Sequence, residues 1–533
     1  MNNNTPLPSG EIFSGGNVNN ASYQEALNVT QENEVAQALT DQPQDQPGAQ
    51  VNPSNPEGSS GFPNYPSGNQ QNIPPTAEGP PPFIEDKTKK FLIIGGVIVL
   101  LVIFIFLMFK FLSGRFARPP AQAKINLTYW NLWEEETVIR PFIDEFQKSH
   151  PNITVSYSRQ DPKQYRERLQ AAISRGEGPD LFRFHNTWVP MLLGELAPMP
   201  KTIYSDSDFE KIFYPVASES LKTGGNLYGI PLMIDGLLLF YNEDILKSAN
   251  VPVPVTWVDV QNAVPKLTVK EDNRIVTSAI SLGTAENIEH FSDILGLMML
   301  QNGTQPVKSV FTCSDPDSST CAVEALTFYR KFAETPNNAW DATLENSIVA
   351  FAGGKVAMIL APSWEAITIK NLSPNLNFKT AQVPQLPCDR TPCPTVNWAS
   401  FWVEGVSAKS KNQEAAWEFL KYLSQPETMQ KMYAEQVKLR PLFGEPYSRT
   451  DLAKILADNV YLAPLILSAP TMKSFYLASR TFDGETGLNT SLINYLKDAV
   501  NSLSQGTSVE SALKIVDDGF KQVFARFNIA APQ

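Results

Sequence analysis

The chain has 533 residues, 42% of them hydrophobic, and a formal net charge of −12. This length leaves room for more than one domain, and the composition suits a globular protein. We expect no nucleic acid among its partners, and neither a cofactor nor a metal.

The first segment, residues 1–88, is predicted to be a disordered tail. It is rich in Asn, Gln, Pro, Gly and Ser, and it contains no Lys or Arg before Lys87. Such a composition offers too little apolar surface to offset the entropy lost on ordering. A solvated spacer is the simplest interpretation, and a docking tail for a cytoplasmic partner is the alternative.

An apolar segment follows, and we expect it to be a single transmembrane helix over residues 89–112. No residue from 91 to 109 is charged, and most are Ile, Leu, Val or Phe. At about 1.5 Å per residue, this run is long enough to cross a hydrocarbon core. A linker, 113–123, is expected after it. The lipid bilayer is therefore a predicted partner, reached through this one span.

The four cysteines all follow the apolar segment, and they indicate its orientation. They form two close pairs in loops rich in Ser, Asp, Thr and Pro, with spacings that differ from zinc knuckles. Such loops favour disulfides in an exported domain. We therefore expect the C-terminal domain outside the cell and the tail in the cytoplasm. Local pairs are favoured, Cys313 with Cys321 and Cys388 with Cys393, while the crossed pairings stay open.

The remaining chain, from residue 124, alternates strands with helices. Apolar alternation predicts strands at 125–129 and 153–157, and a third is predicted at 181–184. This order predicts an α/β fold with a parallel, doubly wound sheet. Helices are predicted from the apolar stripes Val138, Phe142 and Phe146, and Tyr165, Leu169 and Ile173 with an end at Gly176.

The C-terminal part is predicted to be mostly helical. Helices are expected at 413–423 and 488–503. Thr507 with Glu510 has the spacing of a capping box for a last helix that runs through Phe524.

A series of motifs resembles the extracellular solute-binding proteins of the maltose-binding type. Each motif is short, but their order and spacing together are specific, and the resemblance runs from about residue 124 to the C-terminus. The motifs are 178–181 (GPDL), 228–231 (YGIP) with Asp235, 241–244 (YNED), 251–257 (VPVPVTW), 351–358 (FAGGKVAM), 362–364 (PSW) and 410–420.

The resemblance implies a two-lobed, periplasmic-binding-protein-like (type II) fold with a hinge. By analogy the chain crosses between lobes near Gly236, Trp398 and Tyr447. Lobe 1 would comprise about 124–236 and 398–447, and lobe 2 about 237–397 and 448–533. Hinge closure would capture a carbohydrate, an oligosaccharide by preference, for delivery to the permease subunits of an ABC importer. Many relatives are anchored by a lipidated N-terminal cysteine; no cysteine precedes Cys313, so the apolar segment is expected to anchor this chain.

Candidate ligand residues lie at strand ends and crossovers. A sugar site needs carboxylates or amides for hydroxyls and aromatic rings for the apolar ring face. The resemblance favours Asp235 as a hydroxyl acceptor and Trp364 as a stacking ring, on opposite walls of the cleft. The candidates are Trp133, Glu134, His185, Asn186, Trp188, Asp235, Glu289, Phe291, Trp364, Trp398 and Trp402.

Other interpretations are weaker. Most Trp and Phe side chains belong to cores, and a His is more often a hydrogen-bonded structural residue than a ligand contact. The chain lacks the common hydrolase, metalloprotease and nucleotide-binding motifs, so we expect no enzyme. A glycoside hydrolase would need two facing carboxylates, such as Glu134 and Asp235. A ligand sensor that signals through the membrane span is the other alternative.

Overall fold

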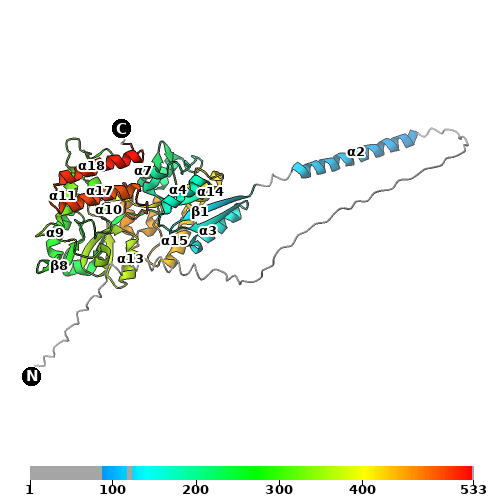
Figure 1. Ribbon diagram of the computed structural model, residues 1–533. Helices are drawn as coiled ribbons and strands as arrows, with labels where there is room; N and C mark the ends of the chain where they lie inside the picture. Colours follow the sequence, from blue (N-terminus) through cyan, green and yellow to red (C-terminus); the bar gives the residue numbers. More distant parts are fainter. Residues whose placement is uncertain (1–86, 117–122, 390, 531–533) are drawn as a thin grey trace, which may run out of the picture. The chain divides into compact units, whose positions relative to one another are not determined.

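The computed structural model describes residues 87–116, 123–389 and 391–530. Contacts divide the chain into two units, one holding residues 124–533 and the other 35–123 (Figure 1). Residues 1–86 of the predicted tail and 117–122 of the predicted linker lie outside the described residues.

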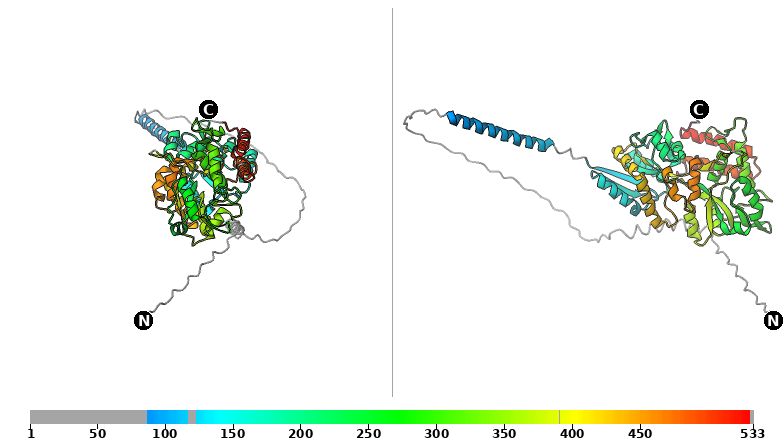
Figure 2. Two further views of the ribbon diagram at one scale, coloured as in Figure 1. Left: turned by 90° about the vertical axis from the view of Figure 1, so that its left-hand side faces the viewer. Right: turned by 180° about the vertical axis from the view of Figure 1, so that it is seen from behind.

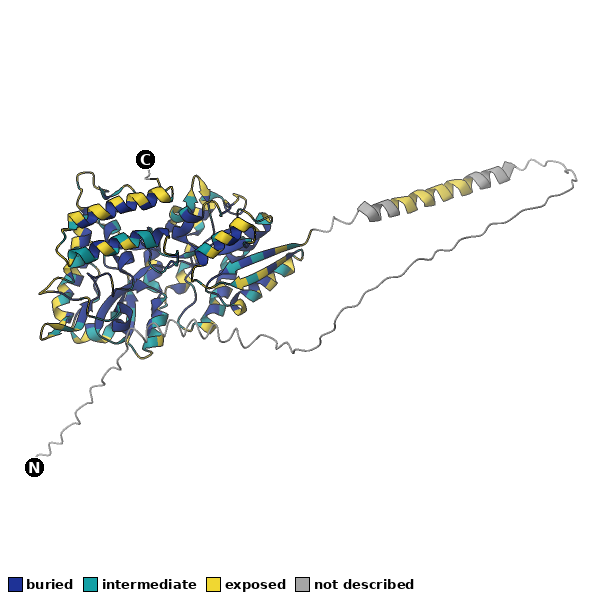
Figure 3. Cartoon of the chain, in the orientation of Figure 1, coloured by how far each residue is buried: buried dark blue, intermediate teal, exposed yellow. Residues whose placement is uncertain are grey.

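The described part of the smaller unit is the helix α2 (Lys87–Phe116). Among the residues that the structure describes, no helix is both long enough and apolar enough to cross a membrane. The predicted transmembrane helix is therefore not supported. The side chains of residues 95–110 of α2 are exposed (Figure 3).

A four-stranded sheet forms the core of the first lobe. β1 pairs in parallel with β2 and β3, which confirms the first three predicted strands. The expectation of a wholly parallel sheet is wrong, because β14 runs antiparallel to β3. β14 comes from late in the chain and enters the sheet without a βα crossover, so nothing requires it to be parallel. In spatial order the strands are β14 (Trp402–Val406), β3 (Leu181–His185), β1 (Ile125–Asn131) and β2 (Ile153–Arg159).

The helices of this lobe follow the predicted apolar stripes. α3 buries five apolar residues along one face, and α4 ends at Gly176, whose φ of 76° suits glycine. Late helices pack beside early ones, with α14 against β1 and α15 against α3 (Figure 2). The helices are α3 (Glu136–Ser149), α4 (Tyr165–Arg175), α5 (Val189–Leu192), α6 (Asp206–Ile212), α7 (Pro215–Leu221), α14 (Gln413–Leu423) and α15 (Pro426–Leu439), with the 3₁₀ turn η1 (Asn186–Trp188).

A five-stranded mixed sheet forms the core of the second lobe. β11 is parallel to β8 and antiparallel to β6, and its side chains are buried along the whole strand. The strands in order are β12 (Phe378–Ala381), β6 (Leu237–Asn242), β11 (Val356–Pro362), β8 (Arg274–Ile280) and β7 (Val269–Glu271). Its helices are α8 (Glu243–Ser248), α9 (Trp257–Leu267), α10 (Phe291–Gln301), α11 (Cys321–Lys331), α12 (Ser347–Ala352), α13 (Glu365–Leu372) and α16 (Ala463–Ser468), with η2 (Thr450–Leu456) and η3 (Ala469–Thr471).

Two long helices end the chain. α17 (Leu488–Leu503) has the predicted bounds, and α18 (Val509–Arg526) packs against both α17 and α11 (Figure 1). The predicted cap at Thr507 is wrong by one residue. Ser508 caps α18, because its hydroxyl accepts the backbone N–H of Ser511.

The two sheets meet where short bridges join distant segments. Gly236 pairs with Ala399, and Met233 pairs with Tyr447. A side chain at Gly236 would clash with the carbonyl oxygen of Trp398, so this close approach requires glycine. These contacts lie where the sequence predicts the crossings, although the lobe limits themselves stay a prediction. The remaining strands are the pairs β13 (Asn397–Trp398) with β15 (Met472–Lys473), β4 (Lys222–Thr223) with β5 (Asn226–Leu227), and β9 (Thr304–Gln305) with β10 (Ser309–Cys313).

Both predicted disulfides are present. Cys313 pairs with Cys321 and Cys388 with Cys393, each with a Cα–Cα distance of 5.9 Å. The crossed pairings are thereby excluded.

Candidate functional site

The site begins on one face of the first sheet. Trp402 of β14 lies opposite His185 of β3, and Glu404 lies opposite Arg183. Side chains two residues apart share a face of a strand. An aromatic level and an ionic level therefore lie next to each other on this sheet.

The aromatic level gathers five rings, here called the first aromatic cluster: Trp133, Trp188, Trp402, His185 and Phe482. Ring centroids lie 5.4 Å from Trp402 to Trp133, 5.5 Å to Trp188 and 5.2 Å to His185. Phe482 contacts Trp133 at 5.8 Å. Trp188 is fully buried, whereas Trp133, Trp402 and Phe482 are half-buried. These three rings retain surface that could cover an apolar ligand face.

His185 holds its place in the cluster through two hydroxyls. Its Nδ1 lies 2.8 Å from Thr187 Oγ1, and its Nε2 lies 3.0 Å from Ser400 Oγ. Burial lowers the pKa of His185 to about 3. The imidazole is therefore neutral at physiological pH, and both of its nitrogens are engaged.

Asn186 is also buried and engaged on both sides of its amide. Its Nδ2 donates to Ser474 Oγ at 2.8 Å and to Ser220 Oγ at 3.2 Å, and its Oδ1 accepts from the backbone N–H of Phe401. The amide thus joins three segments beside the cluster.

The ionic level centres on Arg183. Its guanidinium donates to Glu404 at 2.7 Å and to Glu445 at 2.6 Å, and its side chain is 2% exposed. Burial raises the pKa of Glu404, while for Glu445 the nearby Arg183 outweighs burial and lowers the pKa. Arg183 thus pairs with two carboxylates, the buried Glu404 and the half-buried Glu445, and Arg440 also lies near Glu445.

Glu134 belongs to this ionic level. Its Oε1 accepts from Gln436 Nε2 at 3.0 Å and from Arg440 at 2.6 Å. Burial and the neighbouring Glu445 raise its pKa. The neighbouring residues Trp133 and Glu134 therefore take part in two different levels.

Asp235 lies at the crossing between the sheets. Its Oδ1 accepts the backbone N–H of Gly236 at 2.7 Å and of Ser363 at 3.0 Å. Burial raises its pKa to about 6, against the opposing effect of these backbone donors. Asp235 thus binds the residue that precedes Trp364, and the placement of the two side chains on opposite walls stays a prediction.

His290 was not among the candidates predicted from the sequence, but several of those candidates lie around it. We call His290, Glu365, Asp293, Ser479 and Trp398 the His290 group. His290 Nε2 lies 3.1 Å from Glu365 Oε1, and Nδ1 lies 2.8 Å from Ser479 Oγ. Asp293 accepts from Trp398 Nε1 at 2.9 Å and from the backbone N–H of Ser479 at 2.9 Å. Trp398 is thus a fully buried structural partner.

Glu289 and Phe291 flank His290 but differ in exposure. Glu289 is half-buried, ion-pairs with Arg480 and accepts from Asn346 Nδ2 at 2.7 Å. Burial would raise its pKa, but Arg480 outweighs burial and lowers it. Phe291 is 7% exposed and begins α10.

The segment 479–483 supplies the residues that sequence reasoning missed. Arg480 and Phe482 both have positive φ, 56° and 54°, which is uncommon for such side chains and often marks a functional site. Asp483 accepts from the start of α17, and its carbonyl accepts from Arg166 Nε of α4 at 2.6 Å. The only local signal is Asp483 followed by Gly484, a common turn pair.

The family described as "Bacterial extracellular solute-binding protein" matches residues 142–445, more than half of the chain. The chain belongs to this family. As a solute-binding protein it is not an enzyme, in agreement with the sequence-based expectation.

Curated relatives of this solute-binding protein carry sugar names. The "Multiple sugar-binding protein" of Streptococcus mutans is 21% identical over 381 residues, covering 70% of this chain and 86% of that protein. The "Maltodextrin-binding protein MdxE" of Bacillus subtilis is 30% identical over 225 residues, covering 40% of this chain and 49% of that protein.

Solved structures show the same fold. A cyclo/maltodextrin-binding protein complexed with maltotetraose superposes with a TM-score of 0.60 at 19% identity, covering 76% of this chain and 99% of that one. The sugar-binding protein MalE of Xanthomonas citri gives 0.60 at 20% identity, covering 76% and 98%. At this identity the likeness establishes the two-lobed fold alone.

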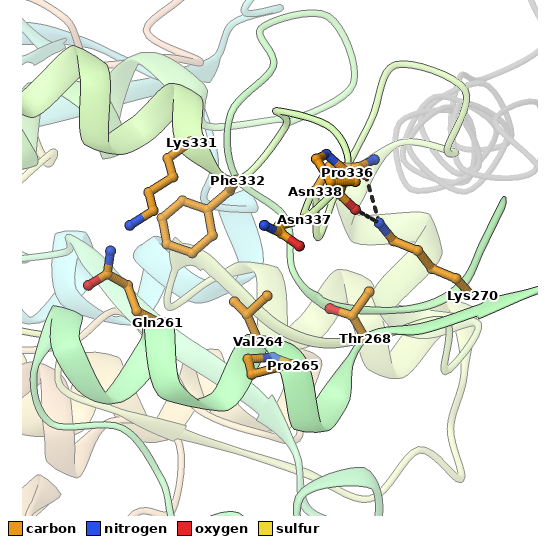
Figure 4. A pocket seen from close by; sticks show the side chains of 10 residues that line it. All are labelled: Gln261, Val264, Pro265, Thr268, Lys270, Lys331, Phe332, Pro336, Asn337 and Asn338. Atoms are coloured by element: carbon orange, nitrogen blue, oxygen red, sulfur yellow. Dashed lines mark hydrogen bonds between the residues drawn. The ribbon is translucent and has the colours of Figure 1, made fainter. Parts of the chain in front are cut away.

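A cavity of about 460 Å³ lies elsewhere, between α9 and the segment after α11 (Figure 4). Over the described residues, its lining contains none of the predicted site residues. Nor does the part of the chain that the structure describes contain a cluster of His, Cys, Asp or Glu suited to a metal ion. The lining residues are Gln261, Val264, Pro265, Thr268, Lys270, Lys331, Phe332, Pro336, Asn337 and Asn338.

Proposed function

We propose that this solute-binding protein captures a carbohydrate, preferably an oligosaccharide, by hinge closure and delivers it to an ABC importer. The sugar names of the two curated relatives support this ligand class. So does the maltotetraose bound by one structural neighbour.

The observation that carries the proposal is the first aromatic cluster. The ring centroids of the half-buried Trp133 and Trp402 lie 5.4 Å apart, and Trp402 also packs on the fully buried Trp188. Rigid indole rings with remaining open surface suit the apolar face of a sugar ring. The hydroxyl of Ser400, which contacts His185, adds a polar group at the edge of this surface.

Other candidates take different roles in this proposal. Trp364 is half-buried and provides a third stacking ring. Asp235, Asn186 and Glu289 are polar groups that either receive sugar hydroxyls or fix the loops that do. Glu134, His185, Trp188, Phe291 and Trp398 are buried and are proposed to support the surface.

The domain is proposed to work outside the cytoplasm. Two disulfides close short loops, and no cysteine in the chain is left free. Disulfides persist in oxidising compartments. The family description, which includes the word extracellular, agrees with this placement.

Calorimetric titration of the full chain with a glycan panel that includes maltotetraose tests the proposal. Trp402→Ala should weaken binding of the recognised glycan by about 10- to 100-fold, from lost stacking and apolar contact. Phe328→Ala is the matched control. Phe328 is also a half-buried aromatic residue, but its ring packs on Trp257, which does not belong to the first aromatic cluster. Equal affinity of both variants would place the ligand elsewhere.

Asp235 needs a gentler substitution. Asp235→Asn keeps an oxygen for the backbone donors of Gly236 and Ser363 but removes the charge. If the carboxylate binds a sugar hydroxyl, affinity should fall about 10- to 150-fold. Unchanged affinity with unchanged melting would assign Asp235 to holding the crossing instead.

A further inference from the structure

His290 joins three separate segments in the interior of the protein. It is 1% exposed, immediately precedes α10, and binds Glu365 at the start of α13 and Ser479 in the segment 479–483. The edge of its ring also meets Trp364, with centroids 5.7 Å apart. One imidazole therefore contacts both a proposed stacking ring and the segment with positive φ angles.

The groups that face His290 are acidic. Glu365 comes from α13, Asp293 from α10 with its Oδ2 4.0 Å from Nδ1, and Glu289 from the segment before α10. The nearby cation of the segment 479–483, Arg480, pairs with Glu289. In the described part of the chain, His290 is the one cation within ion-pair distance of Glu365 and Asp293.

This environment favours the charged imidazole. Burial alone would lower the pKa of His290, but the hydrogen bond and the charge of Glu365, with Asp293 and Glu289, outweigh burial and raise it. A neutral ring would leave two buried carboxylates, Glu365 and Asp293, without their facing positive charge. Such uncompensated burial is costly, and a local rearrangement relieves it.

The segment bound by His290 reaches the other half of the site. The backbone N–H of Ser479 is held by Asp293, and three residues later Phe482 packs on Trp133 of the first aromatic cluster. On its other side, Glu365 directly follows Trp364. His290 is thus placed to fix the rings Trp364 and Phe482 together.

We propose that charged His290 is a positioning residue that holds Trp364 and the segment 479–483 in the arrangement that binds ligand. This rests on the proposed function, because the positioned rings are those assigned to the sugar. It adds a control by pH: the arrangement is intact at acidic pH and loosens when His290 loses its proton. The loosening begins above about pH 6.5, the ordinary histidine value, since the pKa of folded His290 is raised.

The first test needs no ligand. The chain contains three histidines, so histidine-labelled full-length protein gives three imidazole signals for NMR titration. We expect one of them, absent in His290→Gln, to remain charged at pH 6.5. The same titration should show His185 neutral. A neutral His290 at pH 6.5 would overturn the proposal.

The second test measures the rate of hydrogen exchange in the segment 479–483. The Ser479 amide is protected by its bond to Asp293, so its exchange, corrected for the intrinsic effect of pH, reports this contact. We expect it to accelerate by about tenfold or more above the His290 transition, the size of one lost charge-assisted hydrogen bond. In His290→Gln it should be fast at every pH. In the control His185→Gln the step should persist. A flat wild-type profile would contradict the proposal.

Binding supplies a third readout. The affinity for the panel glycan, measured from pH 7 to 8.5 so that Asp235 stays charged, should fall with rising pH in the wild type and stay low and flat in His290→Gln. If no glycan binds, the proposed function fails, while the titration and exchange results still decide the role of His290. If a glycan binds with pH-independent affinity, the positioning role is refuted and the carbohydrate function stands.

Discussion

The candidate site has two halves: the first aromatic cluster with the ionic level beside it, and the His290 group. Each half contains one buried histidine, and the surroundings of the two histidines move their pKa values in opposite directions. The two ring nitrogens of His185 lie beside the hydroxyls of Thr187 and Ser400, which carry no charge, so burial dominates and lowers its pKa to about 3. His290 meets Glu365, and that carboxylate reverses the effect of burial and raises the pKa. Equal burial thus gives a neutral support in one half and a charged one in the other.

The two halves also differ in the cation that neutralises their buried carboxylates. Beneath the first aromatic cluster, Arg183 serves Glu404 and Glu445, and an arginine stays charged at any physiological pH. In the His290 group the facing cation is an imidazole, which can lose its proton near neutral pH. Loss of a proton from the facing cation should therefore affect the second half and not the first.

The largest effect should come from removing the permanent cation. Arg183→Met leaves the buried Glu404 without its paired cation and removes one of the two arginines near Glu445, so it should reduce the free energy of unfolding by about 3–5 kcal/mol. Arg175→Met is the matched control, because the pair of Arg175 with Glu177 is exposed and should contribute at most about 1 kcal/mol. Denaturant unfolding measures both. Equal losses for the two variants would refute the structural role assigned to the ionic level.

A smaller effect should separate the two halves in ligand binding. Trp364→Ala should weaken glycan binding by about 10- to 100-fold, as expected for Trp402→Ala, if both halves contact the sugar. Calorimetry on both variants provides the comparison. Wild-type affinity in Trp364→Ala alone would confine the ligand to the first aromatic cluster and leave the His290 group structural.

The smallest effect is the pH slope of stability, which should have opposite signs for the two histidines. Below about pH 6.5 His185 binds a proton in the unfolded state but stays neutral in the folded state. Its contribution to the free energy of unfolding is therefore complete above pH 6.5 and is lost as the pH falls toward 3. Folded His290 retains a proton above 6.5, so its contribution is complete below 6.5 and is lost as pH rises through its raised pKa.

Each slope is at most about 1.4 kcal/mol per pH unit. Subtracting the unfolding profiles of His185→Gln and His290→Gln from the wild type isolates the two contributions. Slopes of the same sign would show that the two environments do not differ as described.

Much of the fold was predictable because local patterns determine it. The apolar stripe of α3 and the glycine that ends α4 specify those helices. The first and last residues of the late helix α17 were also predicted correctly. The antiparallel entry of β14 was not, because its direction depends on the crossing from the other sheet. Thr507 and Ser508 offer the same capping chemistry, so the sequence could not choose between them.

The site was predictable only in part. Strand ends located Trp133, His185 and Trp402, which do meet. The engagement of Glu134 with Arg440 was hidden, because 306 residues separate the partners. Phe482 lies in a loop without a motif, and only its backbone conformation and its contact with Trp133 single it out.

Native mass spectrometry of the full chain with a glycan library tests the central claim most directly. It weighs the bound species, so it distinguishes an intact sugar from a released product. The proposed function predicts one or more glycans bound intact at one copy per chain, retained by Phe328→Ala and lost or weakened in Trp402→Ala. Failure of every glycan to bind, or equal binding by both variants, would contradict the assignment of the first aromatic cluster as a carbohydrate site.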